Sequence, residues 1–89
     1  MAPLRSVVRR GEYYDSVLLM RVSEEVRRAP GVKEAAVLMA TDTNKRMLSD
    51  VGLLTEDVKR AGADDLVIVV EAIDDESAGK AILRADELL

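Results

Sequence analysis

Residues 66–72, LVIVVEA, begin with five consecutive branched aliphatic side chains. The polar Ala63-Asp64-Asp65 segment precedes this run, and Asp74 and Asp75 follow it closely. An apolar run of this length between polar boundaries is typical of a strand that is covered on both faces. We therefore predict that residues 66–72 form the central strand of a sheet.

Two other segments are predicted to join this strand. Residues 5–10, RSVVRR, are β-branched at their centre and lead into the turn residues GEYY. Residues 31–41, GVKEAAVLMAT, contain the run Val37, Leu38 and Met39, which indicates burial on both faces. The sequence thus predicts a small sheet of about three strands.

Helices are predicted between these strands and after the last one. Asp15 is the expected N-cap of a helix that runs to about Ala29, whose first half is apolar nearly all round and should be covered on more than one side. Two short helices should follow, over Asn44 to Val51 and from Thr55 to about Ala61. The final helix is capped by Asp74 or Asp75, and its core stripe comprises Ala78, Ala81, Ile82, Ala85 and Leu89.

This order predicts an α/β domain, an α+β sandwich with ferredoxin-like connectivity that lacks the last strand; a half-wound α/β topology is the alternative. The 89 residues suffice for one domain, residues 1–89. The missing strand would have covered the edge of the first strand, and natural proteins rarely leave such an edge bare. Dimerisation through the first strand, or a partner domain, would cover it.

Composition narrows the function. The net charge of −4 and the presence of only two aromatic residues argue against nucleic acid as a partner. No apolar run is long enough to span a membrane and no signal peptide is evident, so we expect a cytoplasmic protein. The chain has neither histidine nor cysteine, which removes the usual transition-metal ligands and the commonest catalytic groups. We therefore assign no catalytic or metal-binding residue.

The junction MATDTNKRML, residues 39–48, is the first candidate site. Backbone N–H groups where a strand meets a helix can hold an anion, and Thr41, Thr43, Asn44 and Lys45 are the candidate ligands there. The glycines of a phosphate loop are absent and Asp42 would repel an anion. Capping of the helix by Asp42 or Thr43 is therefore the favoured interpretation.

Three further groups of residues have both a functional and a structural interpretation. Tyr13 and Tyr14 could line a ligand groove, although packing of one ring against the helix start is favoured. The acidic residues Glu71 and Asp74 to Glu76 could hold Mg²⁺, although they more simply begin a helix. The last group could form a binding surface, although filling of the core is favoured, and it comprises Met20, Met39 and Met47.

Three segments, YYDSVLLM (13–20), MATDTNKRMLSDVGL (39–53) and ADDLVIVVEA (63–72), resemble the N-terminal domain of the FdrA family. This family is acyl-CoA synthetase-like, is related to the alpha subunit of succinyl-CoA synthetase and has been associated with oxamate carbamoyl transfer. The chain lacks a glycine-rich CoA loop and a phosphoryl-carrying histidine. The resemblance therefore implies no catalysis and no cofactor for this chain alone, with CoA bound only through a partner domain.

The resulting functional expectation is a non-catalytic domain or small subunit of an FdrA-like acyl-CoA synthetase or carbamoyltransferase system. It would act by assembly, either as a homodimer or with the CoA-binding and ligase parts. The alternative is a stand-alone homo-oligomeric module that binds a small ligand or regulates, using the groove near residues 41–45.

Overall fold

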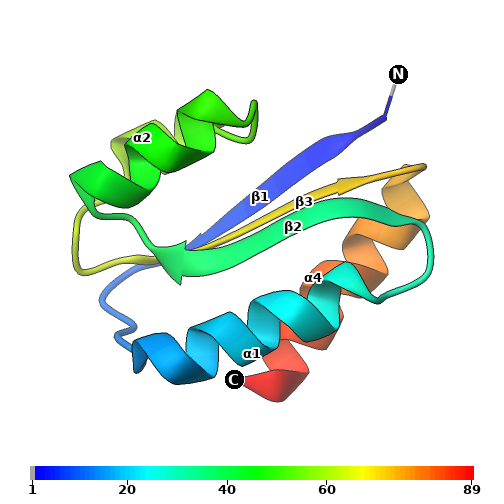
Figure 1. The fold of residues 1–89 in the computed structure, drawn as a ribbon, viewed down its shortest axis with the longest axis horizontal. Helices are drawn as coiled ribbons and strands as arrows, with labels where there is room; N and C mark the ends of the chain where they lie inside the picture. Colours follow the sequence, from blue (N-terminus) through cyan, green and yellow to red (C-terminus); the bar gives the residue numbers. More distant parts are fainter. Residues whose placement is uncertain (1) are drawn as a thin grey trace.

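The computed structural model describes residues 2–89 as a three-stranded antiparallel sheet with helices on both faces (Figure 1). The elements, in chain order, are β1 (Leu4–Arg9), α1 (Ser16–Arg27), β2 (Val32–Met39), α2 (Asp42–Asp50), α3 (Glu56–Arg60), β3 (Leu66–Ala72) and α4 (Asp75–Leu88).

The central position of β3 confirms the prediction made from its apolar run. The strand order is β1-β3-β2, and β3 runs antiparallel to both neighbours. Helix α1 connects the two outer strands, so β3 lies between the strands that α1 joins. This is the predicted ferredoxin-like connectivity without the last strand, and it leaves β1 and β2 as the two edges of the sheet.

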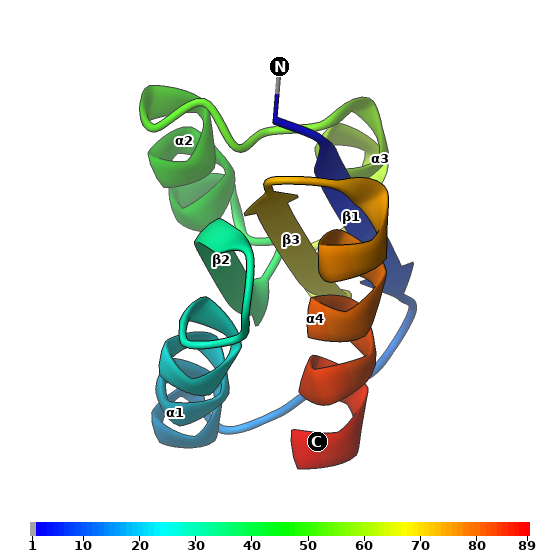
Figure 2. The ribbon, with the colours of Figure 1, turned by 90° about the vertical axis from the view of Figure 1, so that its right-hand side faces the viewer.

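The side chains of β3 alternate between two cores. Leu66, Ile68 and Val70 face α1 and α4, whereas Val67 and Val69 face the side of α2 and α3. Figure 2 shows the two helix pairs on opposite sides of the sheet. All five side chains are fully buried. Both faces of β3 are therefore covered, as a strand without polar alternation requires.

The caps of three helices agree with the sequence, and one does not. The predicted caps Asp15 and Asp74 accept hydrogen bonds from backbone N–H groups of their own first turns, and so does Thr55, at which the third helix was predicted to start. The prediction that Asp42 or Thr43 caps α2 is wrong. Thr41 has the extended backbone of an N-cap, and its Oγ1 accepts a hydrogen bond of 3.2 Å from Asn44 N.

Helix α1 departs from prediction in its surroundings. It ends at Arg27 rather than Ala29, because the chain turns there toward Pro30-Gly31. Its first half is not covered on more than one side, since Val17 is 57% exposed and Met20 is 65% exposed. These side chains are left on the exposed surface of the helix.

The methionines do not share one role. Met39 is buried in the core, as predicted. Met20 and Met47 are exposed, so the interpretation of all three as core filler is wrong for two of them.

Among residues 2–89, no helix is both long and apolar enough to cross a membrane.

Candidate functional site

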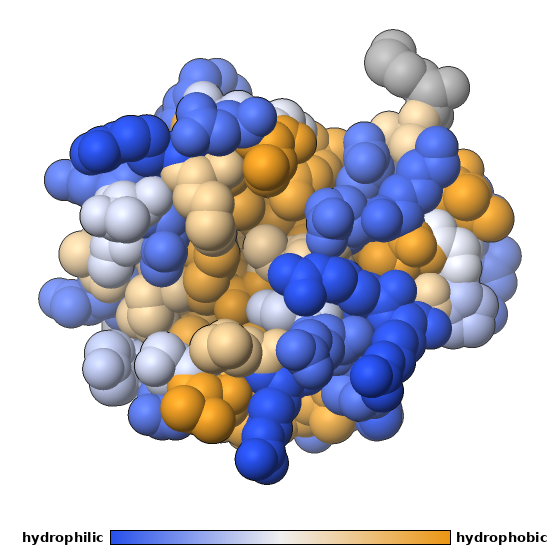
Figure 3. Space-filling view, viewed as in Figure 1, coloured by the Kyte–Doolittle hydropathy of each residue, from blue (hydrophilic) through white to orange (hydrophobic). Residues whose placement is uncertain are grey.

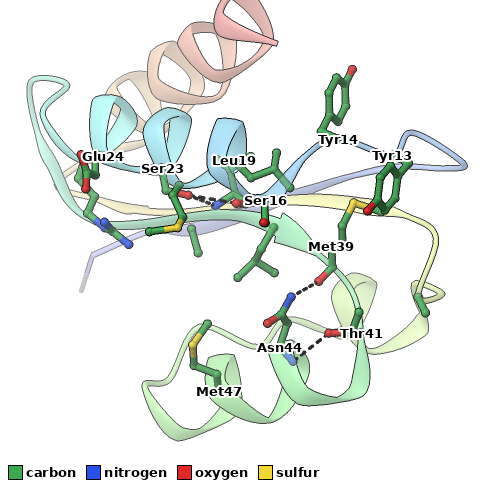
Figure 4. Close-up of a pocket in the computed structure, with 16 residues that line it drawn as sticks. Tyr13, Tyr14, Ser16, Leu19, Ser23, Glu24, Met39, Thr41, Asn44 and Met47 are labelled. Atoms are coloured by element: carbon green, nitrogen blue, oxygen red, sulfur yellow. Dashed lines mark hydrogen bonds between the residues drawn. The ribbon is translucent and has the colours of Figure 1, made fainter.

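A groove of about 530 Å³ runs along the outer edge of β2. Helix α1 forms one wall and α2 the other, because these helices lie on opposite faces of the sheet (Figure 4). The floor is the strand itself, from Ala36 to Met39. The groove therefore lies where a further strand would otherwise add to the sheet.

Side chains from both walls satisfy the backbone on this floor. The Oγ of Ser23 accepts a hydrogen bond from Val37 N at 2.9 Å and donates one to Val37 O at 3.0 Å. Arg27 Nε donates to Ala35 O, and Asn44 Nδ2 donates to Met39 O. The carbonyl groups of Ala35, Val37 and Met39 and the N–H of Val37 are thus already engaged, which disfavours pairing of an incoming strand with the β2 edge.

The structure brings four of the six predicted site residues together in this groove: Tyr13, Tyr14, Thr41 and Asn44. Tyr14 packs against the core, and its hydrogen bond to the Glu12 carboxylate raises the pKa of Tyr14. Tyr13 is 77% exposed and lies at the mouth of the groove (Figure 4). One ring therefore packs beside the helix start and the other remains available for a contact.

The two other predicted residues do not line the groove. Lys45 Nζ donates to Lys59 O at 3.1 Å and also to Ala61 O. These carbonyl groups lie at the C-terminal end of α3, where a cation is favoured. The ammonium group of Lys45 therefore joins α2 to α3, and Thr43 is exposed in the first turn of α2.

The rims of the groove are apolar, which sequence reasoning missed. Val17 and Met20 are exposed on α1, and Met47 and Val51 are exposed on or just after α2. Spacings of three and four residues align each pair on one helix face. Figure 3 shows apolar residues gathered in the hollow between α2 and α1. The available signal was a second apolar stripe beside the buried one.

Asp65 holds the loop that carries the two tyrosines. Its carboxylate accepts hydrogen bonds from Gly11 N at 2.9 Å and Gly62 N at 2.8 Å, and Arg10 lies 3.7 Å away. The hydrogen bond from Gly62 N lowers the pKa of Asp65 most, and the hydrogen bond from Gly11 N lowers it further. The loop after β1 is thereby joined to the start of β3.

We expect Asp65→Asn to lower the urea midpoint of unfolding at about pH 7, because the charged acceptor of two N–H groups is lost. A lowered pKa stabilises the folded chain fully above the ordinary value of 3.8, and this contribution is lost as the pH falls through the lowered value. The difference in urea midpoint from the parent chain should therefore narrow as the pH falls below 3.8. Asp64→Asn is the matched control; equal effects of both substitutions at neutral pH would contradict this role.

The residues thus define an α+β domain with ferredoxin-like connectivity and an apolar groove at one sheet edge. A family model described as "AllF, heavy metal-associated domain" matches residues 1–89, and the chain belongs to this family. It is also 34% identical over 85 residues to the uncharacterized protein YahF of Escherichia coli strain K12. That match covers 96% of this chain and 16% of YahF. No solved structure matches the chain.

The family match overturns the resemblance to the FdrA family. The whole chain matches the AllF domain, and neither comparison points to an acyl-CoA synthetase. The segments that carried the resemblance are mainly buried strands and helix junctions, including residues 66–72 and the cap Thr41. Such segments record a fold more than an activity, which is why they suggested the wrong family.

The donor groups of the chain do not fit the metal in the family's description. Soft heavy metals select thiolate and imidazole ligands, and the sequence contains no cysteine or histidine. Within residues 2–89, no three side chains of the metal-binding types are grouped. Asp74, from the acidic segment considered for Mg²⁺, instead caps α4 by accepting from Ser77 N at 2.7 Å.

Proposed function

We propose that this chain is a non-catalytic assembly domain, which binds an apolar segment of a partner polypeptide in the groove beside β2. One observation carries the proposal. Seven large hydrophobic side chains are exposed within residues 2–89, and three of them, Tyr13, Met20 and Met47, line this one groove. Two more, Val17 and Val51, are exposed three residues before Met20 and four residues after Met47.

Gathered apolar side chains on a surface mark a site of interaction, whereas scattered ones need no explanation. Methionine suits such a site because its unbranched, polarizable side chain adapts to different partner surfaces. The closed edge of β2 disfavours an added strand, so the occupant is expected to contribute side chains. An amphipathic helix that presents apolar residues at spacings of three and four meets this requirement.

The polar groups of the groove support a binding role rather than catalysis. Ser23 Oγ donates its proton to Val37 O and accepts a hydrogen bond from Val37 N. Its hydroxyl proton is therefore held by a backbone carbonyl group and not by a side chain that could act as a general base. Arg27 and Asn44 are likewise engaged with backbone carbonyl groups. These side chains are engaged with the backbone of the groove floor, so the apolar side chains of the groove remain available for contact with a partner.

The partner segment is proposed to lie in a longer protein that contains a domain of this kind. The chain spans 16% of the length of YahF, so such a relative has much polypeptide beside the matched region. Assembly of the chain with a second copy of itself, which the bare edge of the first strand predicts, belongs to the same proposal and uses a different surface.

A second candidate is a homo-oligomeric module that binds a small ligand. It is favoured by the groove's volume of about 530 Å³, since small-molecule sites commonly occupy roughly 300–1,000 Å³. The two candidates differ in which residues the bound partner or ligand should cover. A polypeptide should cover Val17 and Val51 as well as the groove, whereas a small ligand should contact the floor around Met39.

The test uses the chain with ¹³C-labelled methionine methyl groups and YahF from which the matched segment has been removed. We expect binding that shifts the signals of Met20 and Met47. Met20→Glu should weaken binding roughly tenfold or more, because a carboxylate would be desolvated in the interface. Leu83→Glu, an equally exposed apolar position on α4, is the matched control and should bind normally.

YahF's own matched segment, supplied separately, serves as the positive control for the truncated protein. Binding by that segment but not by this chain would contradict the proposal. So would binding that leaves the methionine signals unchanged or that survives Met20→Glu. Circular dichroism establishes that both substituted chains remain folded.

A further inference from the structure

The outer edge of β1 is built differently from that of β2. Ala72 N donates to Pro3 O at 3.0 Å, which orients the backbone of Pro3 toward β3. Because hydrogen-bonded and non-hydrogen-bonded pairs alternate along an antiparallel pair, the backbone N–H and C=O groups of Leu4, Ser6 and Val8 then face away from β3. Within residues 2–89, no side chain hydrogen-bonds to the backbone of these three residues. Their N–H and C=O groups therefore face outward without the cover that Ser23 gives to β2.

The side chains of β1 are also incompletely covered. None of the residues from Leu4 to Arg9 is buried, whereas β2 buries half of its residues. Leu4 and Val8 pack against the α2 and α3 side while keeping part of their surface exposed. An edge with apolar side chains and free backbone groups is a template for another strand.

We infer that β1 pairs with β1 of a second copy of this chain, antiparallel, about a two-fold axis at Ser6. The central hydrogen-bonded pair is then Ser6 with Ser6 of the other copy. Leu4 lies opposite Val8 at each end, so that apolar side chains meet across the axis on the face of α2 and α3. The two sheets join into one continuous sheet of six strands, twice the three strands of one copy.

Charge selects this register over its neighbours. Arg5 and Arg9 lie on the opposite face of β1, where they pair with Asp75 and Asp86 of α4. An axis at Ser6 places Arg5 opposite Val7 and Arg9 opposite Pro3. An axis at Val7 would place Arg5 opposite Arg9, and an axis at Arg5 would place two Arg5 side chains together. Like charges directly opposite each other destabilise a strand pair.

The inference deepens the self-assembly part of the proposed function and does not depend on the groove. The test exploits the absence of cysteine from the chain. Ser6→Cys places two thiols opposite each other, at about 5.5 Å between Cα atoms, which a disulfide can bridge. In the same register Val8→Cys separates the two thiols by four residues along the strand, about 13 Å, which a disulfide cannot bridge.

We expect the unmodified chain to sediment as a dimer. Under mild oxidation, we expect Ser6→Cys to form a covalent dimer while Val7→Cys and Val8→Cys do not. A monomer at every concentration would overturn the inference, and preferential cross-linking of Val7→Cys would overturn the register. Met20→Glu should leave the cross-linking of Ser6→Cys unchanged. Failure of the groove and failure of the β1 pairing are therefore distinguished in the same set of variants.

Discussion

Replacing Gly31 by alanine is expected to lower the free energy of unfolding by about 2–5 kcal/mol. Gly31 has φ of +80°, a conformation that a side chain disfavours. An added Cβ would also lie 2.7 Å from Ser77 Cβ. The turn cannot move away freely, because Ile73 N donates to Gly31 O at 2.8 Å. Urea unfolding followed by circular dichroism measures the loss.

Gly11→Ala is the matched control for this substitution. Gly11 has a similar φ of +70°, but an added Cβ there meets no atom within 4 Å. It should lose only about 1–2 kcal/mol, from backbone conformation alone. Equal losses at Gly31 and Gly11 would show that the contact with Ser77 relaxes without cost.

Ser23→Ala should lower the free energy of unfolding by about 1–3 kcal/mol, because Val37 N–H and C=O lose their common partner. Ser23 is only 7% exposed, so water replaces the hydroxyl poorly. The substitution also uncovers the β2 edge, and the variant should aggregate more readily on incubation, as followed by light scattering.

Ser16→Ala serves as the control on the same helix, since Ser16 lines the same groove but is exposed. It should change neither stability nor aggregation measurably. A Ser23→Ala chain that unfolds at the parent's urea concentration and stays monodisperse would show that the β2 edge is protected by its setting rather than by this hydroxyl.

The sheet was predictable because its signal is local and strong. Five branched aliphatics at residues 66–70 satisfy only a strand covered on both sides, and that strand is the one at the centre. The cap Asp15 was likewise predictable from residue type and position. The cap of α2 was not, because Thr41, Asp42 and Thr43 are all good caps and tertiary contacts decide among them.

The groove was only partly predictable. Tyr13, Tyr14, Thr41 and Asn44 were identified, although as ligands of an anion or small molecule rather than as parts of one apolar groove. What escaped was long-range: Lys45 meets the end of α3, and α1 and α2 face each other across β2. Such contacts depend on how elements are placed in space, which local spacing does not encode.

The unequal edges of the sheet have a consequence for stoichiometry. A sheet with two open edges can add copies at both ends and grow into a fibre, whereas a sheet closed on one side can be extended only on the other. The hydroxyl of Ser23 engages the β2 edge, and β1 has no such cover. The proposed pairing through β1 would therefore terminate at two copies and give a closed complex of fixed size.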